Sequence, residues 1–277
     1  MRIDLETAQH HLEWDELARR VKLGEDLGFE GVWIFDHFKP LYGDKKGPCM
    51  EGWSTLGAMA ALTEKVRIGN LVTGVTYRHP SVLAATAATV DNIAHGRLEF
   101  GIGAAWHDEE HRELGIDFAS NRGRAERLED AIEIYKRLTT EEDTSYNGKH
   151  FSLDKATYNP KPVQDPWPPI WIGASGEQIM LPLVGRQADV WHSFSGGSTF
   201  KRKWDILAEA AEKAGRKPDD VRCSTNLSIS EDWSEVKDHA SQMAELGVSI
   251  LIVPWPSEGQ PRLEEFVSDV MPEVQKL

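Results

Sequence analysis

The sequence LGFEGVWIF, residues 27–35, links an expected helix to an expected buried strand. Before it, apolar residues recur every three or four positions from Trp14 to Leu27, which predicts an amphipathic helix ending at Gly28. After it, residues 31–35 are a short apolar run of the kind found in buried strands. The same joint returns as LGVSILIV at residues 246–253, where Gly247 closes a second helical pattern. We interpret the two stretches as one architectural joint used twice, not as a sequence duplication.

Strand-like and helix-like segments alternate eight times along the chain. The expected strands are Ile3–Leu5, Gly31–Phe35, Val66–Val72, Leu98–Ile102, Ile170–Ile172, Ala188–Trp191, Arg222–Leu227 and Ser249–Val253. Such alternation predicts an α/β fold with a parallel sheet, and eight units favour closure into a single (β/α)8 barrel over an open sheet. The 277 residues suit one such barrel, which typically has about 250 residues, so residues 1–277 are expected to form one domain.

One stretch interrupts the alternation. Residues 141–169 carry charges and five prolines ahead of the fifth expected strand. Asn147-Gly148 suits a hairpin turn between the sequences TSY and HFSL. We therefore expect a short insertion before strand five of the barrel.

The charge and composition of the chain limit the classes of partner that it can bind. A net charge of −14 repels nucleic acid and anionic membranes, and no run approaches the roughly 18 apolar residues of a membrane span. The two cysteines, Cys49 and Cys223, lack metal or redox spacing, which favours a reducing compartment. With no apolar segment in the N-terminal MRIDLETAQHH, we expect a soluble, cytoplasmic protein.

Polar residues and glycines follow the expected strands. In barrels the active site lies at the carboxyl ends of the strands, so these residues are expected to meet at one rim. They are Asp36-His37-Phe38, Thr73-Gly74, Gly103-Ala104-Ala105-Trp106, Gly173-Ala174-Ser175-Gly176 and His192-Ser193. Alone, Asp36 is equally typical of a helix cap or a partner for arginine, and His37 of a buried structural histidine. Their place at the rim favours an acid–base role. The Gly-Ala-Ser-Gly run suits a phosphate at a helix start, although a tight turn needs the same small residues.

Other motifs in the sequence give weaker indications of function. Gly101-Ile102-Gly103 begins like a dinucleotide fingerprint, but Trp106 stands at the third glycine position. His107 and His111 have zinc-helix spacing, yet Asp108 replaces the glutamate that the motif requires, so no metal site is expected. No nucleophile elbow or phosphate loop is present. Such a rim suits a cofactor that brings its own reactivity.

Four segments, taken together and in order, carry a resemblance to a known family. They are FDHF (35–38), VRIGNLVTGVTYRHP (66–80), GRLEFGIGAAW (96–106) and PPIWIGASGE (168–177). The sequence resembles the bacterial luciferase-like family and, within it, the branch of coenzyme F420-dependent oxidoreductases. The resemblance implies a TIM-like barrel with an inserted segment, which agrees with the alternation.

The resemblance also implies residue roles. It places a non-prolyl cis peptide, a bulge behind the deazaflavin ring, at Leu71-Val72. It puts Asp36, Leu71, Val72, Thr73 and Gly74 near the ring. The residues 103–106 and 173–176 are implied near the ribityl-phosphate tail, and His192 and Ser193 line the pocket. His37 matches the family histidine proposed to exchange a proton with the substrate, oriented or charge-tuned by Asp36.

The chain departs from some relatives, which carry a glutamate where it has Trp106 and a tryptophan where it has Leu41. Those residues shape sugar-phosphate chemistry, so that activity is put in doubt. Two other functions remain open: an FMN-dependent monooxygenase supplied by a separate flavin reductase, and a flavin-binding protein without catalysis. The expected partner is a small-molecule substrate, and relatives imply a homodimer.

Overall fold

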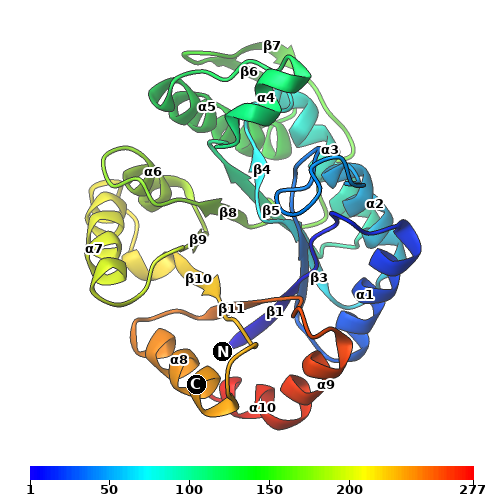
Figure 1. The fold of residues 1–277 in the computed structure, drawn as a ribbon. Helices are drawn as coiled ribbons and strands as arrows, with labels where there is room; N and C mark the ends of the chain where they lie inside the picture. The colour runs from blue at the N-terminus through cyan, green and yellow to red at the C-terminus, as the bar shows by residue number, and fades with distance from the viewer.

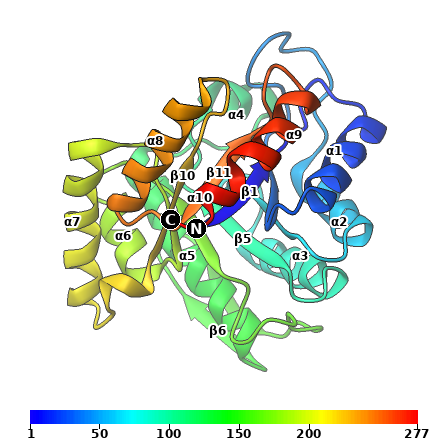
Figure 2. The same ribbon diagram turned by 90° about the horizontal axis from the view of Figure 1, so that it is seen from below.

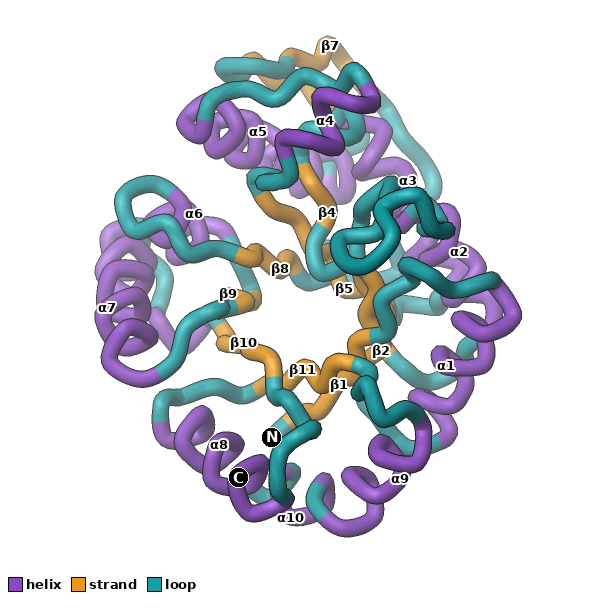
Figure 3. The backbone as a smooth tube through the Cα atoms, in the orientation of Figure 1, coloured by secondary structure: helices purple, strands orange, loops and turns teal.

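The structure is a computed structural model that describes residues 1–277. Parallel strands form a closed ring, completed where β3 pairs with β5 (Figures 1 and 3). In ring order the strands are β3 (Arg67–Asn70), β2 (Gly31–Ile34), β1 (Arg2–Glu6), β11 (Ile250–Pro254), β10 (Arg222–Asn226), β9 (Val190–His192), β8 (Ile170–Gly173) and β5 (Leu98–Gly103). The predicted (β/α)8 barrel is confirmed, and each of the eight predicted strands overlaps one of these.

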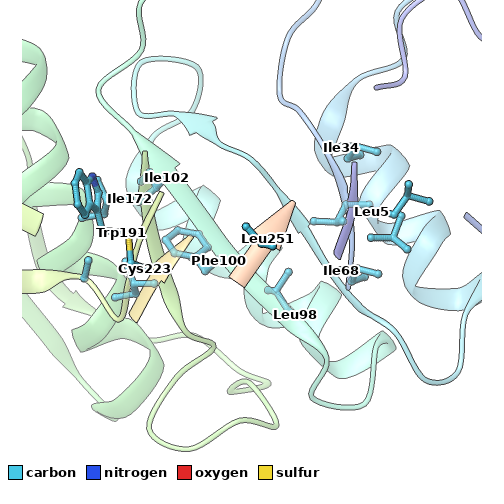
Figure 4. Packing of buried hydrophobic residues seen from close by; sticks show 14 of the residues in the cluster. Leu5, Ile34, Ile68, Leu98, Phe100, Ile102, Ile172, Trp191, Cys223 and Leu251 are labelled. Atoms are coloured by element: carbon cyan, nitrogen blue, oxygen red, sulfur yellow. The ribbon is translucent and has the colours of Figure 1, made fainter. Parts of the chain in front are cut away.

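Helices surround the ring on all sides, as Figure 3 shows. They are α1 (Trp14–Asp26), α2 (Gly52–Leu62), α3 (Pro80–Ile93), α4 (Asp108–Leu114), α5 (Asn121–Thr140), α6 (Met180–Gln187), α7 (Gly197–Lys213), α8 (Trp233–Glu245), α9 (Gln260–Asp269) and α10 (Met271–Val274). The outer faces of the strands pack against these helices through aliphatic and aromatic side chains, including Ile34, Phe100 and Leu251 (Figure 4). No helix is both long and apolar enough to cross a bilayer.

The helix–glycine–strand joint expected at residues 27–35 and 246–253 is present at both places. Gly28 and Gly247 follow α1 and α8, and both have φ +86°, a left-handed conformation that glycine adopts without steric cost. The strands that follow, β2 and β11, both pair with β1. The two joints therefore lead into the two neighbours of the first strand. The termini meet nearby, where the Met1 amino group donates to the Gln275 carbonyl at 2.7 Å (Figure 2).

The third strand is shorter than predicted. The apolar pattern predicted residues 66–72, but β3 ends at Asn70 and pairing resumes in β4 (Thr73–Gly74). The peptide between Leu71 and Val72 is cis and separates the two pieces. The cis peptide that the family resemblance implied is therefore present at the expected position.

The insertion before the fifth barrel strand is a hairpin. β6 (Thr144–Asn147) and β7 (Ser152–Ala156) pair antiparallel around Asn147-Gly148, as the turn signal predicted. The hairpin lies outside the ring, where β6 contacts α5 (Figure 1).

The inside of the barrel is polar as well as aromatic. The rings of Trp33 and Trp171 meet there with centroids 4.4 Å apart. Trp33 donates to the Asp4 carboxylate at 2.8 Å, and Trp171 donates to Glu99 at 2.6 Å. Arg2 pairs with both acids, at 2.8 Å from Asp4 and 2.7 Å from Glu99. Arg67 forms a further ion pair with Glu99. The interior below the rim is thus filled by side chains whose charges are matched.

Candidate functional site

The carboxyl ends of the strands surround a cavity of about 1040 Å³. Most of the predicted site residues line it: Asp36, His37, Leu71, Val72, Thr73, Gly74, Gly103, Ala104, Ala105, Trp106, Gly173, Ala174 and Ser175. They come from segments spread over 140 positions of sequence and meet because parallel strands end at the same rim.

Three predicted residues are not part of the lining. Gly176 lies just beyond Ser175, ahead of α6. His192 is buried at the end of β9, where its Nδ1 is 3.0 Å from the Ser224 hydroxyl. Burial lowers the pKa of His192 to about 4, so the ring is neutral near pH 7. Ser193 is also buried, and its hydroxyl donates to the Ser195 carbonyl at 3.3 Å. The His192 ring packs edge-on against Phe194, which lines the cavity, with ring centroids 4.8 Å apart.

His37 lies in the loop that follows β2, two residues beyond Phe35, and its imidazole contacts α4. Its Nδ1 lies 2.9 Å from Oε2 of Glu110, a fully buried residue in the first turn of that helix. The Tyr77 hydroxyl donates to the same oxygen at 2.5 Å. The other oxygen, Oε1, accepts from the backbone N–H of Phe38 at 2.7 Å and of Lys39 at 3.2 Å. Glu110 therefore fastens both the ring and the backbone of the histidine segment.

The charge of Glu110 determines which nitrogen of His37 carries a hydrogen. Burial opposes ionisation of Glu110, but the hydrogen bonds from His37 and Tyr77 outweigh it and lower the pKa of Glu110 to about 2. A carboxylate only accepts hydrogen bonds, so Nδ1 must carry the hydrogen. Nε2 forms no hydrogen bond within the protein, so in the neutral ring it can accept one beside the cavity.

Asp36 has a different partner from the one predicted. Its carboxylate is bound by Arg78, whose two terminal nitrogens lie 2.6 and 3.0 Å from its oxygens. Burial raises the pKa of Asp36, and the Arg78 guanidinium opposes that change. Arg78 also pairs with Glu51 at the start of α2. No hydrogen bond joins Asp36 to His37, so the contact that orients the ring comes from Glu110, while Asp36 and His37 interact through their charges alone.

The cis peptide forms one wall of the cavity. Leu71 and Val72 both line it, between β3 and β5. A Cβ atom on Gly103 would lie 2.8 Å from the Val72 Cγ2 methyl, so only glycine leaves that methyl where it is. Gly74 is similarly confined, with the Tyr77 ring 2.7 Å from a built Cβ. Because positions 74 and 103 are glycines, the Tyr77 ring and the Val72 methyl can pack directly against the backbone at these positions.

Large aromatic side chains are exposed around the opening. Tyr42, Trp106 and Phe194 line the cavity with 74%, 64% and 67% of their surface exposed. Apolar groups exposed together at a concave site mark a place where a ligand is covered. Trp106 also packs edge-on against His37, with ring centroids 5.7 Å apart.

A possible set of metal ligands adjoins the cavity. His37, His107 and Glu110 each bring one ligand atom to within 4.8 Å of the others. The sequence had paired His107 with His111, whose two nitrogens contact the Thr76 hydroxyl at 2.6 Å and a backbone carbonyl at 2.8 Å. Because both oxygens of Glu110 already accept two hydrogen bonds each, the arrangement supports an acid–base role for His37 over metal binding.

Sequence reasoning missed Glu110, Tyr77 and Glu6. Glu110 was visible only as part of the HDEEH segment, which was examined for metal spacing and then set aside. The available signal was its place one turn into a helix that begins after the fourth barrel strand. Tyr77 belongs to the 66–80 segment that carries part of the family resemblance, and Glu6 is the last residue of the first strand.

Comparison with known proteins agrees with the barrel and its rim. The family model described as luciferase-like monooxygenase matches residues 2–266. The F420-dependent glucose-6-phosphate dehydrogenase of Microbacterium testaceum (strain StLB037) is 34% identical over 212 residues, which is 75% of this chain. The chain spans 62% of that relative's length and 64% of the same-named enzyme of Nakamurella multipartita, which is 33% identical.

Solved structures share the fold. An F420-dependent secondary alcohol dehydrogenase in complex with an F420-acetone adduct superposes with a TM-score of 0.87 at 20% identity, covering 99% of this chain and 98% of its own. The coenzyme F420-dependent tetrahydromethanopterin reductase of Methanopyrus kandleri has a TM-score of 0.85 at 19% identity, covering 99% of both chains.

Proposed function

This chain belongs to the luciferase-like monooxygenase family, and we propose that it is a coenzyme F420-dependent oxidoreductase acting on a small organic substrate. One observation carries the proposal. His37 is held at Nδ1 by Glu110 and leaves Nε2 free, in the same cavity as the cis peptide of Leu71-Val72. A positioned base beside a smooth apolar wall suits a cofactor that carries the hydride while the protein manages the proton.

The choice of cofactor is supported by the relatives and by the fit of the cavity. Curated relatives at 33–34% identity are named as F420-dependent. The cavity, about 1040 Å³, has room for a tricyclic ring and a substrate. Gly74 and Gly103 let the Tyr77 ring and the Val72 methyl pack directly against the lining of the cavity, where Cβ atoms would collide with them.

In this proposal the predicted site residues keep their roles. Leu71, Val72, Thr73 and Gly74 hold the ring, with Asp36 beside it. The segments 103–106 and 173–176 hold the ribityl-phosphate tail, and His192 and Ser193 support the pocket from behind.

The protein's own contribution is proton handling and exclusion of water. When bound, coenzyme F420 supplies a ring carbon, C5, that gives or accepts a hydride. His37 Nε2 takes the proton from a substrate hydroxyl, or returns one to a carbonyl in the opposite direction. Glu110 stabilises the imidazolium formed during the transfer, and its position at Nδ1 keeps Nε2 aimed at the cavity. Trp106 and Phe194 lie at the opening, where they would cover the reactants.

The test is binding followed by turnover. Purified protein titrated with F420 is expected to bind it with micromolar or tighter affinity, followed by the cofactor's fluorescence. His37→Ala should bind F420 within twofold of wild type and lose about 10²–10⁴-fold in turnover. Tight FMN uptake with no F420 binding would overturn the proposal and favour an FMN-dependent monooxygenase.

We also propose that the chain acts as a homodimer in the cytoplasm, with a separate reductase renewing the reduced cofactor. Val82 and Ile93 of α3 are 57% and 41% exposed and border a shallow apolar groove beside α2, which supports a self-association surface. Sedimentation velocity at micromolar concentration tests the dimer.

A further inference from the structure

Glu6 is the last residue of β1, and its side chain lines the cavity. It pairs with Trp33 of β2 and with Pro254 of β11. Because side chains alternate along a strand, Glu6 faces the barrel interior together with Arg2 and Asp4. It therefore stands at the level where the packed interior opens into the cavity.

The three acids of the barrel interior differ in whether their carboxylates have a partner within the protein. Asp4 is bound by Arg2 and Trp33, and Glu99 by Arg2, Arg67 and Trp171. The carboxylate of Glu6 forms no hydrogen bond and no ion pair with the protein, and its backbone carbonyl accepts from Trp255 N–H at 2.8 Å. Burial raises the pKa of Glu6 to about 7. A carboxyl group held in a pocket without a partner is costly, and a ligand that donates to it would remove that cost.

The neighbouring lining includes a single lysine or arginine side chain, that of Arg20. Its Nε donates to Glu16 at 2.7 Å, and its guanidinium lies 4.2 Å from the ring centroid of Trp255. Asn226 ends β10, two strands from Glu6, and its amide side chain forms no hydrogen bond with the protein. Apart from Arg20, this end of the cavity thus presents acceptors and neutral donors around an aromatic wall.

On the basis of the proposed function, we propose that Glu6 anchors a substrate subsite for a neutral or cationic group that donates hydrogen bonds, a hydroxyl or an amine. An anionic group there would be repelled by the unpaired Glu6 carboxylate. The one arginine of the lining, Arg20, already pairs with Glu16 and packs on Trp255. The curated relatives at 33–34% identity are named for a sugar phosphate. The subsite of this chain has the opposite electrostatic preference, so its substrate lacks a phosphate or carboxylate at this position.

The test uses three alcohols that share a three-carbon chain and differ in one group: 1,2-propanediol, 1-amino-2-propanol and lactate. Binding to F420-loaded wild type at pH 8 is followed by tryptophan fluorescence, since Trp106 and Trp255 line the cavity. The amine and the diol should bind at least tenfold more tightly than lactate, with the amine tightest. In Glu6→Gln the advantage of the amine should fall about tenfold. Glu212→Gln, on the exposed face of α7, is the matched control and should keep the wild-type order.

Equal binding of lactate and the amine, an unchanged order in Glu6→Gln, or no saturable binding of any of the three would each overturn the subsite. The same titrations are run without cofactor, and F420 binding is measured separately for each variant. Loss of F420 binding with a preserved, Glu6-dependent amine preference would count against the proposed function alone. Wild-type F420 affinity with no amine preference would count against the subsite alone.

Discussion

The residue that decides how His37 reacts is Glu110. Its carboxylate occupies Nδ1 and is itself fastened by Tyr77 and two backbone amides. A charged acceptor at Nδ1 does two things: it selects the tautomer with Nε2 free, and it stabilises the imidazolium. Replacing Glu110 by glutamine removes the charge but keeps an oxygen that accepts from the amides of Phe38 and Lys39. The substitution therefore tests the effect of the charge on His37 without releasing the backbone of the histidine segment.

We therefore predict that Glu110→Gln lowers kcat about 10–100-fold while F420 affinity stays within twofold of wild type. Steady-state kinetics give the rate. The ¹H–¹⁵N spectrum of the His37 ring reports the tautomer, which should become mixed. Glu109→Gln, on the same helix but paired with Lys45 at the surface, should behave as wild type. An unchanged kcat in Glu110→Gln would show that the carboxylate serves structure only.

At this scale the sequence identified the histidine but not what holds it. His37 could be predicted because it directly follows a strand, and barrel chemistry gathers there. Glu110 lies 73 positions away, and nothing in local spacing links the two. The sequence left two partners open for Asp36, an arginine or His37. Neighbouring residues on an extended segment point in different directions, and here Asp36 meets Arg78 instead.

At the scale of elements, the wall of the cavity depends on how closely β5 approaches the Leu71-Val72 segment. Gly103 ends β5, and its hydrogen faces the Val72 methyl. Gly57 in α2 offers a contrast, since a Cβ there meets nothing within 4 Å. An alanine at position 103 would collide with Val72, whereas an alanine at position 57 would meet open space.

We predict that Gly103→Ala weakens F420 binding by about tenfold or more, because the added methyl must displace Val72 from the wall. Gly57→Ala should leave binding unchanged and raise stability by about 0.5–1 kcal/mol, as expected for alanine in an open helical position. Fluorescence titration and urea unfolding measure the two effects. Wild-type F420 affinity in Gly103→Ala would mean that this wall does not contact the cofactor.

Strand positions followed from hydrophobic runs and glycine joints, because buried parallel strands need continuous apolar residues. The break in the third strand did not follow from them, since Leu71 and Val72 continue the apolar run. A cis peptide leaves no mark on composition or periodicity. Only the resemblance to a family pointed to it.

At the scale of the whole molecule, the barrel interior carries three acids whose charges have different surroundings. Burial opposes ionisation of Glu99, but Arg2 and Arg67 outweigh it and lower the pKa of Glu99. Its contribution to stability is therefore present above the ordinary carboxyl pKa and is lost as pH falls through the lowered value. For Glu6 the sign is reversed. Its pKa rises to about 7, so stability is full below the ordinary value of 4.5 and declines as pH rises through 7.

Glutamate-to-glutamine substitutions at Glu99 and Glu6 should therefore change the free energy of unfolding in opposite directions. At pH 7, Glu99→Gln leaves two arginines short of a buried partner and should lower the free energy of unfolding by about 3 kcal/mol or more. At pH 8, Glu6→Gln removes an unpaired charge and should raise it by about 1–3 kcal/mol, with the gain vanishing near pH 4.5. Urea unfolding of the cofactor-free protein at pH 4.5, 7 and 8 measures both. A gain in Glu6→Gln that is the same at all three pH values would contradict the account, because only a group that ionises between them produces a gain that grows with pH. The acid left unpaired at the top of the barrel therefore lowers the stability of the ligand-free protein, which is the behaviour expected of a binding group rather than a structural one.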